Sequence, residues 1–266
     1  MKGDPTHIGF PAAATAAGAW VGLHALAIFM ALLLLALIAT VGIWRHVQRG
    51  PRVGQRRWRV VALVLIGSGS ALFILLALLL QPASGLTEFD LALSAAVLAQ
   101  VPASVVRFFG WLTHAGDSAT RTVLALGVGT ALLLARRPVL ALGFAAGLAG
   151  NGALTTLLKH AFGRERPLQP SGGLTAEGYS FPSGHSAGAM VAFGLLAYLA
   201  LRLLPARWHL AALCAAVVMS LGIGASRVFI RAHFPSDVLA GFASGVAWLA
   251  LCVLLMEAAS QRWPRG

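Results

Sequence analysis

Long apolar stretches, separated by short clusters of arginine, run along most of the chain. An α-helix needs about 20 apolar residues to cross the roughly 30 Å hydrocarbon core of a bilayer. Seven stretches approach or reach this length and are predicted to span a membrane: Trp20–Trp44, Val60–Leu80, Ala119–Ala135, Pro138–Leu158, Gly184–Leu201, Trp208–Ala225 and Pro235–Met256. The third is the weakest, because Arg121 interrupts it and must extend toward the membrane interface. The pattern predicts an all-α, polytopic transmembrane bundle.

The segment Gln81–Ser118 is predicted to remain outside the membrane. Its middle part, 88–106, contains apolar residues but also Asp90, Gln100 and Pro102. This mixture is typical of an amphipathic helix that lies on the membrane surface. An eighth span here would also invert the orientation of every later loop.

The composition excludes a soluble domain. Of the 266 residues 58% are hydrophobic and only 11% are charged, whereas soluble domains carry about 25% charged residues. The net charge of +12 does not indicate a nucleic-acid partner, because the charges lie in short clusters between apolar runs and not on a basic face. Both cysteines, Cys214 and Cys252, lie inside apolar runs, which favours neither a metal site nor a disulfide framework.

The distribution of arginines predicts the orientation. If the seven spans alternate, 12 of the 20 basic residues fall on one side: Arg45, Arg49, Arg52, Arg56, Arg57, Arg59, Arg136, Arg137, Arg202, Arg207, Arg262 and Arg265. The positive-inside rule makes this side cytoplasmic. We therefore expect a multi-pass protein of a bacterial-type inner membrane, with its N-terminus outside and its C-terminus in the cytoplasm.

Three polar clusters occupy the opposite, outer ends of the predicted helices. The first extends from Lys159 to Arg166-Pro167, the second is Pro182-Ser183-Gly184-His185, and the third comprises Ser226-Arg227, His233 and Asp237. Each cluster taken singly is explained by interfacial anchoring or helix capping. Together they place two histidines, a carboxylate and three cations on one membrane face, where ionisable groups are functional candidates.

These residue types suit phosphate chemistry. A phosphate monoester is nearly a dianion at neutral pH, and arginine binds its oxygens in a bidentate manner. The helix start at Ser183-Gly184 adds free backbone amides that bind anions. One histidine can attack phosphorus while the other protonates the leaving oxygen. Asp237, four residues after His233, is well placed to hold the attacking imidazole in one tautomer.

At these residues the sequence resembles the type 2 phosphatidic acid phosphatase family, which shares its site with acid phosphatases and vanadium haloperoxidases. The family signature is a lysine, six residues and Arg-Pro; then Pro-Ser-Gly-His; then Ser-Arg, five residues, His, three residues and Asp. All three blocks are complete and in order. The resemblance implies that His233 is the nucleophile of a phosphohistidine mechanism, with Asp237 orienting it and His185 as general acid. It also implies phosphoryl binding by Lys159, Arg166, Arg227 and the Ser183-Gly184 backbone, and no metal or other cofactor.

The resemblance covers roughly 60–256, because the bacterial membrane branch of the family usually has six spans. We therefore divide the chain into residues 1–59, an additional span followed by an arginine-rich cytoplasmic loop, and residues 60–266, a six-span phosphatase core. The predicted activity is a metal-independent lipid phosphate or pyrophosphate phosphatase at the outer face, with undecaprenyl pyrophosphate or phosphatidate as examples of its substrate. The bilayer is its expected environment, and the sequence indicates no oligomeric state.

Two alternatives remain open from the sequence. A lipid-to-lipid phosphotransferase would use the same phosphohistidine, and a transporter or scaffold would retain the fold without turnover. A secreted, soluble phosphatase or haloperoxidase is excluded by the mean hydropathy of +0.82. Four further residues are secondary candidates: Arg164 and Arg231 for binding a second phosphate, and His114 and Asp117 for bordering the site.

Overall fold

The computed structural model describes residues 9–49, 55–82, 84–167 and 178–262. Within these residues the chain forms ten α-helices: α1 (Gly9–Leu23), α2 (Ala25–Arg49), α3 (Gln55–Leu79), α4 (Gly85–Gln100), α5 (Ala103–Leu112), α6 (Ser118–Leu134), α7 (Pro138–Phe162), α8 (Gly184–Leu203), α9 (His209–Phe229) and α10 (Pro235–Arg262). The predicted all-α bundle is confirmed.

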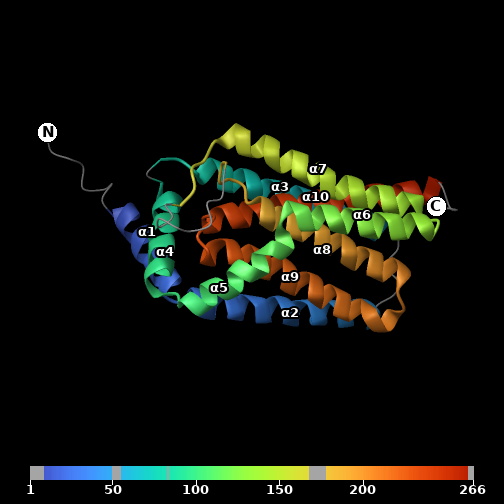
Figure 1. Ribbon diagram of the computed structural model, residues 1–266, viewed down its shortest axis with the longest axis horizontal. Helices are drawn as coiled ribbons and strands as arrows, with labels where there is room; N and C mark the ends of the chain where they lie inside the picture. Colours follow the sequence, from blue (N-terminus) through green and yellow to red (C-terminus); the bar gives the residue numbers. More distant parts are fainter. Residues whose placement is uncertain (1–8, 50–54, 83, 168–177, 263–266) are drawn as a thin grey trace.

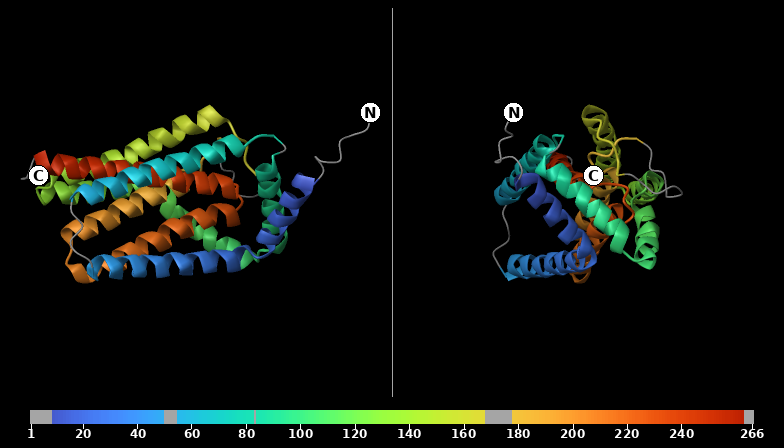
Figure 2. Two further views of the ribbon diagram at one scale, coloured as in Figure 1. Left: turned by 180° about the vertical axis from the view of Figure 1, so that it is seen from behind. Right: turned by 90° about the vertical axis from the view of Figure 1, so that its left-hand side faces the viewer.

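Most of these helices run along the long axis of the molecule. Helices α2, α3 and α6 to α10 form an elongated bundle, while α1 and α4 lie across one end of it (Figure 1). The described chain begins with α1 at that end, and α10 ends at the other, as the view from behind also shows (Figure 2). The arginine-bearing ends of α2, α6 and α8 lie at the end away from α1 and α4.

The seven predicted spans correspond to α2, α3 and α6 to α10. Six of the described helices are long and apolar enough to cross a bilayer, which identifies a multi-pass membrane protein. The seventh, α6, has 17 residues and is shorter than the others; it is the helix that Arg121 interrupts.

The structure corrects the predicted surface helix at 88–106. Instead of one helix, α4 and α5 meet at an angle of 115°, with Pro102 at the bend. Proline has no backbone N–H and disfavours a helical conformation in the residue before it, so the chain turns at this point. Helix α4 lies across the end of the bundle, whereas α5 packs beside α9. The bend therefore places the residues that follow α5 next to the start of α8.

The first predicted span also begins later than expected. Trp20 belongs to α1, which ends at Leu23. A turn at His24 follows, and the spanning helix α2 begins at Ala25. Helix α1 packs closely along α4, where a Cβ on Gly18 would lie 2.3 Å from the carbonyl oxygen of Phe89. Gly22, one turn further, makes a similar approach, and such small-residue spacing allows helices to approach closely.

Helix α8 forms the centre of the bundle and packs against α7, α9 and α10. Its residues Val191 and Leu195 are fully buried and join Phe144 of α7 in the main hydrophobic cluster. Because neighbouring helices are antiparallel, α7 and α9 end where α8 and α10 begin. The three polar clusters of the sequence are thereby brought to one end of the bundle.

Candidate active site

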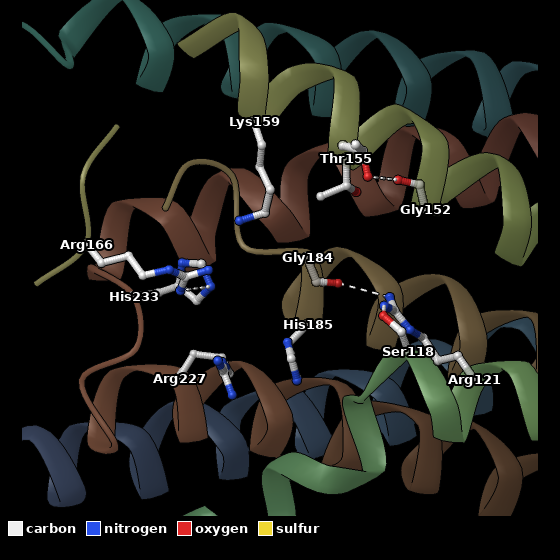
Figure 3. Close-up of a pocket in the computed structure, with 11 residues that line it drawn as sticks. Ser118, Arg121, Gly152, Thr155, Lys159, Arg166, Gly184, His185, Arg227 and His233 are labelled. Atoms are coloured by element: carbon white, nitrogen blue, oxygen red, sulfur yellow. Dashed lines mark hydrogen bonds between the residues drawn. The ribbon is translucent and has the colours of Figure 1, made fainter. Parts of the chain in front are cut away.

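A polar cavity of about 410 Å³ lies where these four helix ends meet. Eleven described residues line it: Ser118, Arg121, Gly152, Thr155, Thr156, Lys159, Arg166, Gly184, His185, Arg227 and His233 (Figure 3). Six of the eight site residues predicted from the sequence are among them. The other two, Ser183 and Asp237, are fully buried directly behind the cavity wall.

His233 lies in the short connection between α9 and α10, with Asp237 behind it in the first turn of α10. Nδ1 of His233 is 3.5 Å from Oδ2 of Asp237 and 3.3 Å from the hydroxyl of Ser180. The Asp237 carboxylate is itself fixed, because it accepts hydrogen bonds from the backbone N–H of Phe234 and from Ser180. A carboxylate at Nδ1 favours the tautomer in which the proton resides there, which leaves the lone pair of Nε2 free.

Nε2 of His233 faces the cations of the cavity. It lies 3.2 Å from Nη1 of Arg166. Burial lowers the pKa of His233 to about 3, although the hydrogen bond and the charge of Asp237 act in the opposite direction. The imidazole is therefore neutral over the physiological range, as a nitrogen nucleophile requires.

Four of the eleven described lining residues are cationic and none is acidic. Backbone oxygens orient these cations: Arg166 donates to the carbonyl groups of Gly178 and Ala232, and Lys159 donates to that of Tyr179. Arg227, which is 6% exposed, donates to the hydroxyl of Thr113. Such a set of oriented cations without an acid suits an anionic ligand.

The start of α8 lines the same cavity through Gly184 and His185. Ser183 caps the helix with its side chain, and its own N–H donates to the carbonyl oxygen of Asp237 at 3.0 Å. Helix α10 approaches this turn very closely, because a Cβ on Gly241 would lie 2.6 Å from the carbonyl oxygen of Ser183. The N-terminus of a helix attracts anions through its free N–H groups and its dipole.

His185 has an acidic partner, Asp117, that does not belong to the signature motifs. Its Nε2 lies 2.8 Å from Oδ1 of Asp117, and the other carboxylate oxygen lies 2.8 Å from Nδ1 of His114. Burial would raise the pKa of Asp117, but the hydrogen bonds from His114 and His185 outweigh it and hold that pKa below its usual value. Asp117 therefore presents a negative charge to His185. Two of the four secondary candidates, Asp117 and His114, thus lie beside the site, although neither lines the cavity.

Arg164 is placed differently from the second-phosphate role considered in the sequence. Its guanidinium lies between two fully buried carboxylates, with Nη2 at 2.8 Å from Asp90 and Nη1 at 2.6 Å from Asp237. Asp90 also accepts hydrogen bonds from the N–H and the hydroxyl of Ser236. Arg164 thus supports the back of the site and does not line the cavity. Arg231 does not line it either, and its Nε lies 3.4 Å from the hydroxyl of Ser94.

Arg121 is a cavity residue that the sequence did not predict. Instead of extending to the interface, it donates to the carbonyl oxygen of Gly184 and to the hydroxyl of Ser118, both at 3.0 Å. Its guanidinium occupies a notch at Gly188, where a Cβ would lie 1.4 Å from Nη1. The interruption of an apolar run by a single arginine was the available signal.

Comparisons with known proteins agree with this architecture. Residues 140–261 match the PAP2 superfamily. Phosphatidylglycerophosphatase B of Bacillus subtilis is 30% identical over 138 residues, which cover 51% of this chain and 67% of that protein. The six long apolar helices define a polytopic membrane protein. This chain belongs to the PAP2 superfamily.

Two further likenesses are informative. A lipid A 1-phosphatase of Rhizobium johnstonii is 37% identical over 132 residues, or 43% of this chain. The chain spans about half the length of that relative, namely 50%. The fold resembles the crystal structure of a transmembrane PAP2 type phosphatidylglycerolphosphate phosphatase from Bacillus subtilis, with a TM-score of 0.64 and 24% identity. That likeness covers 74% of this chain and 97% of the other.

Proposed function

We propose that this protein is a lipid phosphatase that hydrolyses a terminal phosphate or pyrophosphate group through a phosphohistidine intermediate. The observation that carries the proposal is the environment of His233. Its Nδ1 faces a buried carboxylate, while its Nε2 faces a cavity lined by four cations. A neutral nucleophile directed into a cationic cavity is the arrangement that phosphoryl transfer to nitrogen requires.

The reaction takes place in two steps. Nε2 of His233 attacks phosphorus, the P–N bond forms, and the bond from phosphorus to the leaving oxygen breaks. His185 gives a proton to that oxygen. A water molecule then attacks phosphorus, His185 takes up one of its protons, and inorganic phosphate leaves as the P–N bond breaks. Lys159, Arg166, Arg227 and the N–H groups at the start of α8 stabilise the charge on the phosphoryl oxygens in both steps.

The position of the cavity supports a lipid substrate. It opens at the ends of α7 and α8, where the polar headgroups of a bilayer lie beside membrane-spanning helices. The relatives are named as phosphatases of lipid A and phosphatidylglycerophosphate, so both headgroups belong in the test panel. The arginine-bearing helix ends lie at the opposite end of the bundle, which supports a cavity at the outer face under the positive-inside rule.

Phosphate release from a panel of lipids tests the proposal. The detergent-purified protein is given phosphatidate, phosphatidylglycerophosphate, undecaprenyl pyrophosphate and lipid A with a chelator present, beside the variant His233→Ala. We expect release from at least one lipid, no effect of the chelator, and loss of release in the variant. A ³²P label that stays on the denatured wild-type protein, but not on the variant, identifies the phosphohistidine.

Other outcomes separate the alternatives. Transfer of the labelled phosphate to a second lipid without release of inorganic phosphate assigns the phosphotransferase reaction. Neither release nor labelling with any of the four lipids overturns the enzymatic proposal. Release that persists in His233→Ala contradicts the assigned nucleophile.

A further inference from the structure

A second, mostly apolar groove lies along the other half of the bundle. Its volume is about 840 Å³, within the range of about 300 to 1,000 Å³ typical of ligand sites. Residues of α2, α3, α8, α9 and α10 line it. Helices α2 and α3 form its sides, because α2 packs against α9 and α3 against α10 (Figure 2). Small residues, among them Ala197, Ala216 and Ala250, contribute to the lining.

The length of the groove matches one leaflet of a bilayer. On α8 the lining extends from Met190 to Arg202, which is roughly 18 Å of helix at about 1.5 Å per residue. Half of a hydrocarbon core is roughly 15 Å. The lining on α9 and α10 covers the same half, which is the half that ends at the arginine-rich loops. The groove therefore extends from the middle of the membrane to one interface.

The polar character of the groove is concentrated at that interface. Its three charged lining residues are Arg59, Arg202 and Glu257, all at the arginine-rich ends of their helices. Arg202 forms an ion pair with Glu257. Arg59 donates only to the side-chain oxygen of Gln261, at 3.3 Å, and no described carboxylate forms an ion pair with it. Among the described residues, one positive charge at the mouth thus has no ion-pair partner.

We propose that this groove binds an anionic phospholipid of the leaflet at the arginine-rich end, with its phosphate beside Arg59 and its acyl chains along α8 and α10. The headgroup must be anionic because Arg59 supplies the uncompensated charge. The site is separate from the candidate active site, which lies at the opposite ends of the same helices.

The proposal gives the additional N-terminal span a role. Ala36 and Thr40 of α2 form one side of the groove, and α2 contacts the rest of the bundle mainly through α9. A lipid in the groove fills the space between α2 and the helices α8 and α10. Those two helices carry His185 and Asp237 at their other ends, so a bound lipid stabilises the packing on which the site depends.

Thermal unfolding of the full-length protein in detergent tests the proposal. Delipidated protein is titrated with phosphatidylglycerol or with phosphatidylcholine of the same acyl chains, and native mass spectrometry counts the lipids that remain bound. We expect one retained phosphatidylglycerol and a higher midpoint with phosphatidylglycerol than with phosphatidylcholine. Arg59→Gln should raise the half-saturating phosphatidylglycerol concentration roughly fivefold, as loss of one basic residue near an anionic headgroup predicts. Ala62→Trp, which projects into the groove from α3, should abolish the effect of both lipids.

Matched controls lie on the same helix outside the groove. Arg57→Gln and Val64→Trp change exposed residues that do not line it, and both should behave as wild type. Equal midpoint increases with the two lipids, or equal effects of Arg57→Gln and Arg59→Gln, would overturn the proposal. A dimer that Ala62→Trp dissociates would assign the groove to a second copy of the chain instead. If Ala62→Trp does not fold, the comparison of Arg59→Gln with Arg57→Gln still tests the proposal.

Discussion

Nε2 of His185 lies 2.8 Å from Oδ1 of Asp117, so the proposed general acid has a carboxylate partner from the turn that precedes α6. This relationship parallels the one between His233 and Asp237, but with the opposite consequence. Asp237 holds a neutral imidazole in one tautomer. Asp117 stands beside an imidazole that must carry a proton, and a nearby negative charge favours the protonated form.

Asp117→Asn tests this role through the pH dependence of kcat. Without the carboxylate the protonated form of His185 is less favoured, so the alkaline limb of the profile should move to lower pH. We expect a roughly tenfold loss of kcat at pH 8 and a smaller loss at pH 6, since one pKa unit changes the protonated fraction at most tenfold. His114→Gln removes only the exposed partner of Asp117 and should change little. The same loss at both pH values would instead indicate that Asp117 has a purely structural role.

The grouping of the eight candidate site residues could be predicted, because they lie in short motifs at the ends of apolar helices that pack antiparallel. Six of them line one cavity, and Ser183 and Asp237 are buried behind it. Their roles stay predictions. Asp117 and Arg121 were harder to assign, because their positions depend on where α6 begins after the bend at Pro102. No local spacing reveals that Gly188 of α8 receives the side chain of Arg121.

The notch at Gly188 leads to a prediction for Arg121. Arg121→Gln should lower kcat/KM by roughly ten- to a hundredfold, because the hydrogen bond to the Gly184 carbonyl and one cavity cation are lost. Gly188→Ala should have a similar effect, since the three atoms nearest to its added Cβ all belong to Arg121. The double variant should be no worse than either single variant. If the losses of kcat/KM in the two single variants multiply in the double variant, the two residues act independently, which would contradict their contact.

The boundaries of the N-terminal helices show the limit of hydropathy as a guide. Spans were predictable because backbone groups in lipid must be satisfied within each helix. The interruption of the helix at His24 was not predictable, because the apolar run continues through this residue. It depends on α1 seating against α4 through Gly18 and Gly22, which is a tertiary contact. Asp90, read as a sign of exposure, is buried for a similar reason: Arg164 reaches it from a distant part of the chain.

Arg164 leads to a prediction about stability. Arg164→Gln leaves Asp90 and Asp237 close together without their shared cation, and breaking a buried pair in this way costs roughly 3 to 5 kcal/mol. We expect a clearly lower unfolding midpoint in detergent and a loss of activity. Adding Asp90→Asn should recover part of the midpoint, because one of the two remaining charges is removed. Glu88→Gln on the same helix should have no effect, and a double variant less stable than Arg164→Gln would rule out this explanation.

The environment of His233 predicts the acid side of the pH profile. Burial lowers its pKa to about 3, so the imidazole is already neutral at pH 5 and gains nothing as the pH rises to 8. A loss of kcat/KM below neutrality should therefore follow the second ionisation of the substrate phosphate, at about pH 6, and not the nucleophile. Replacing the phosphate by a thiophosphate, whose second pKa is lower, should move this limb to lower pH. A limb that stays near the ordinary histidine pKa of about 6.5 with both substrates would show that His233 titrates normally, which would contradict its lowered pKa.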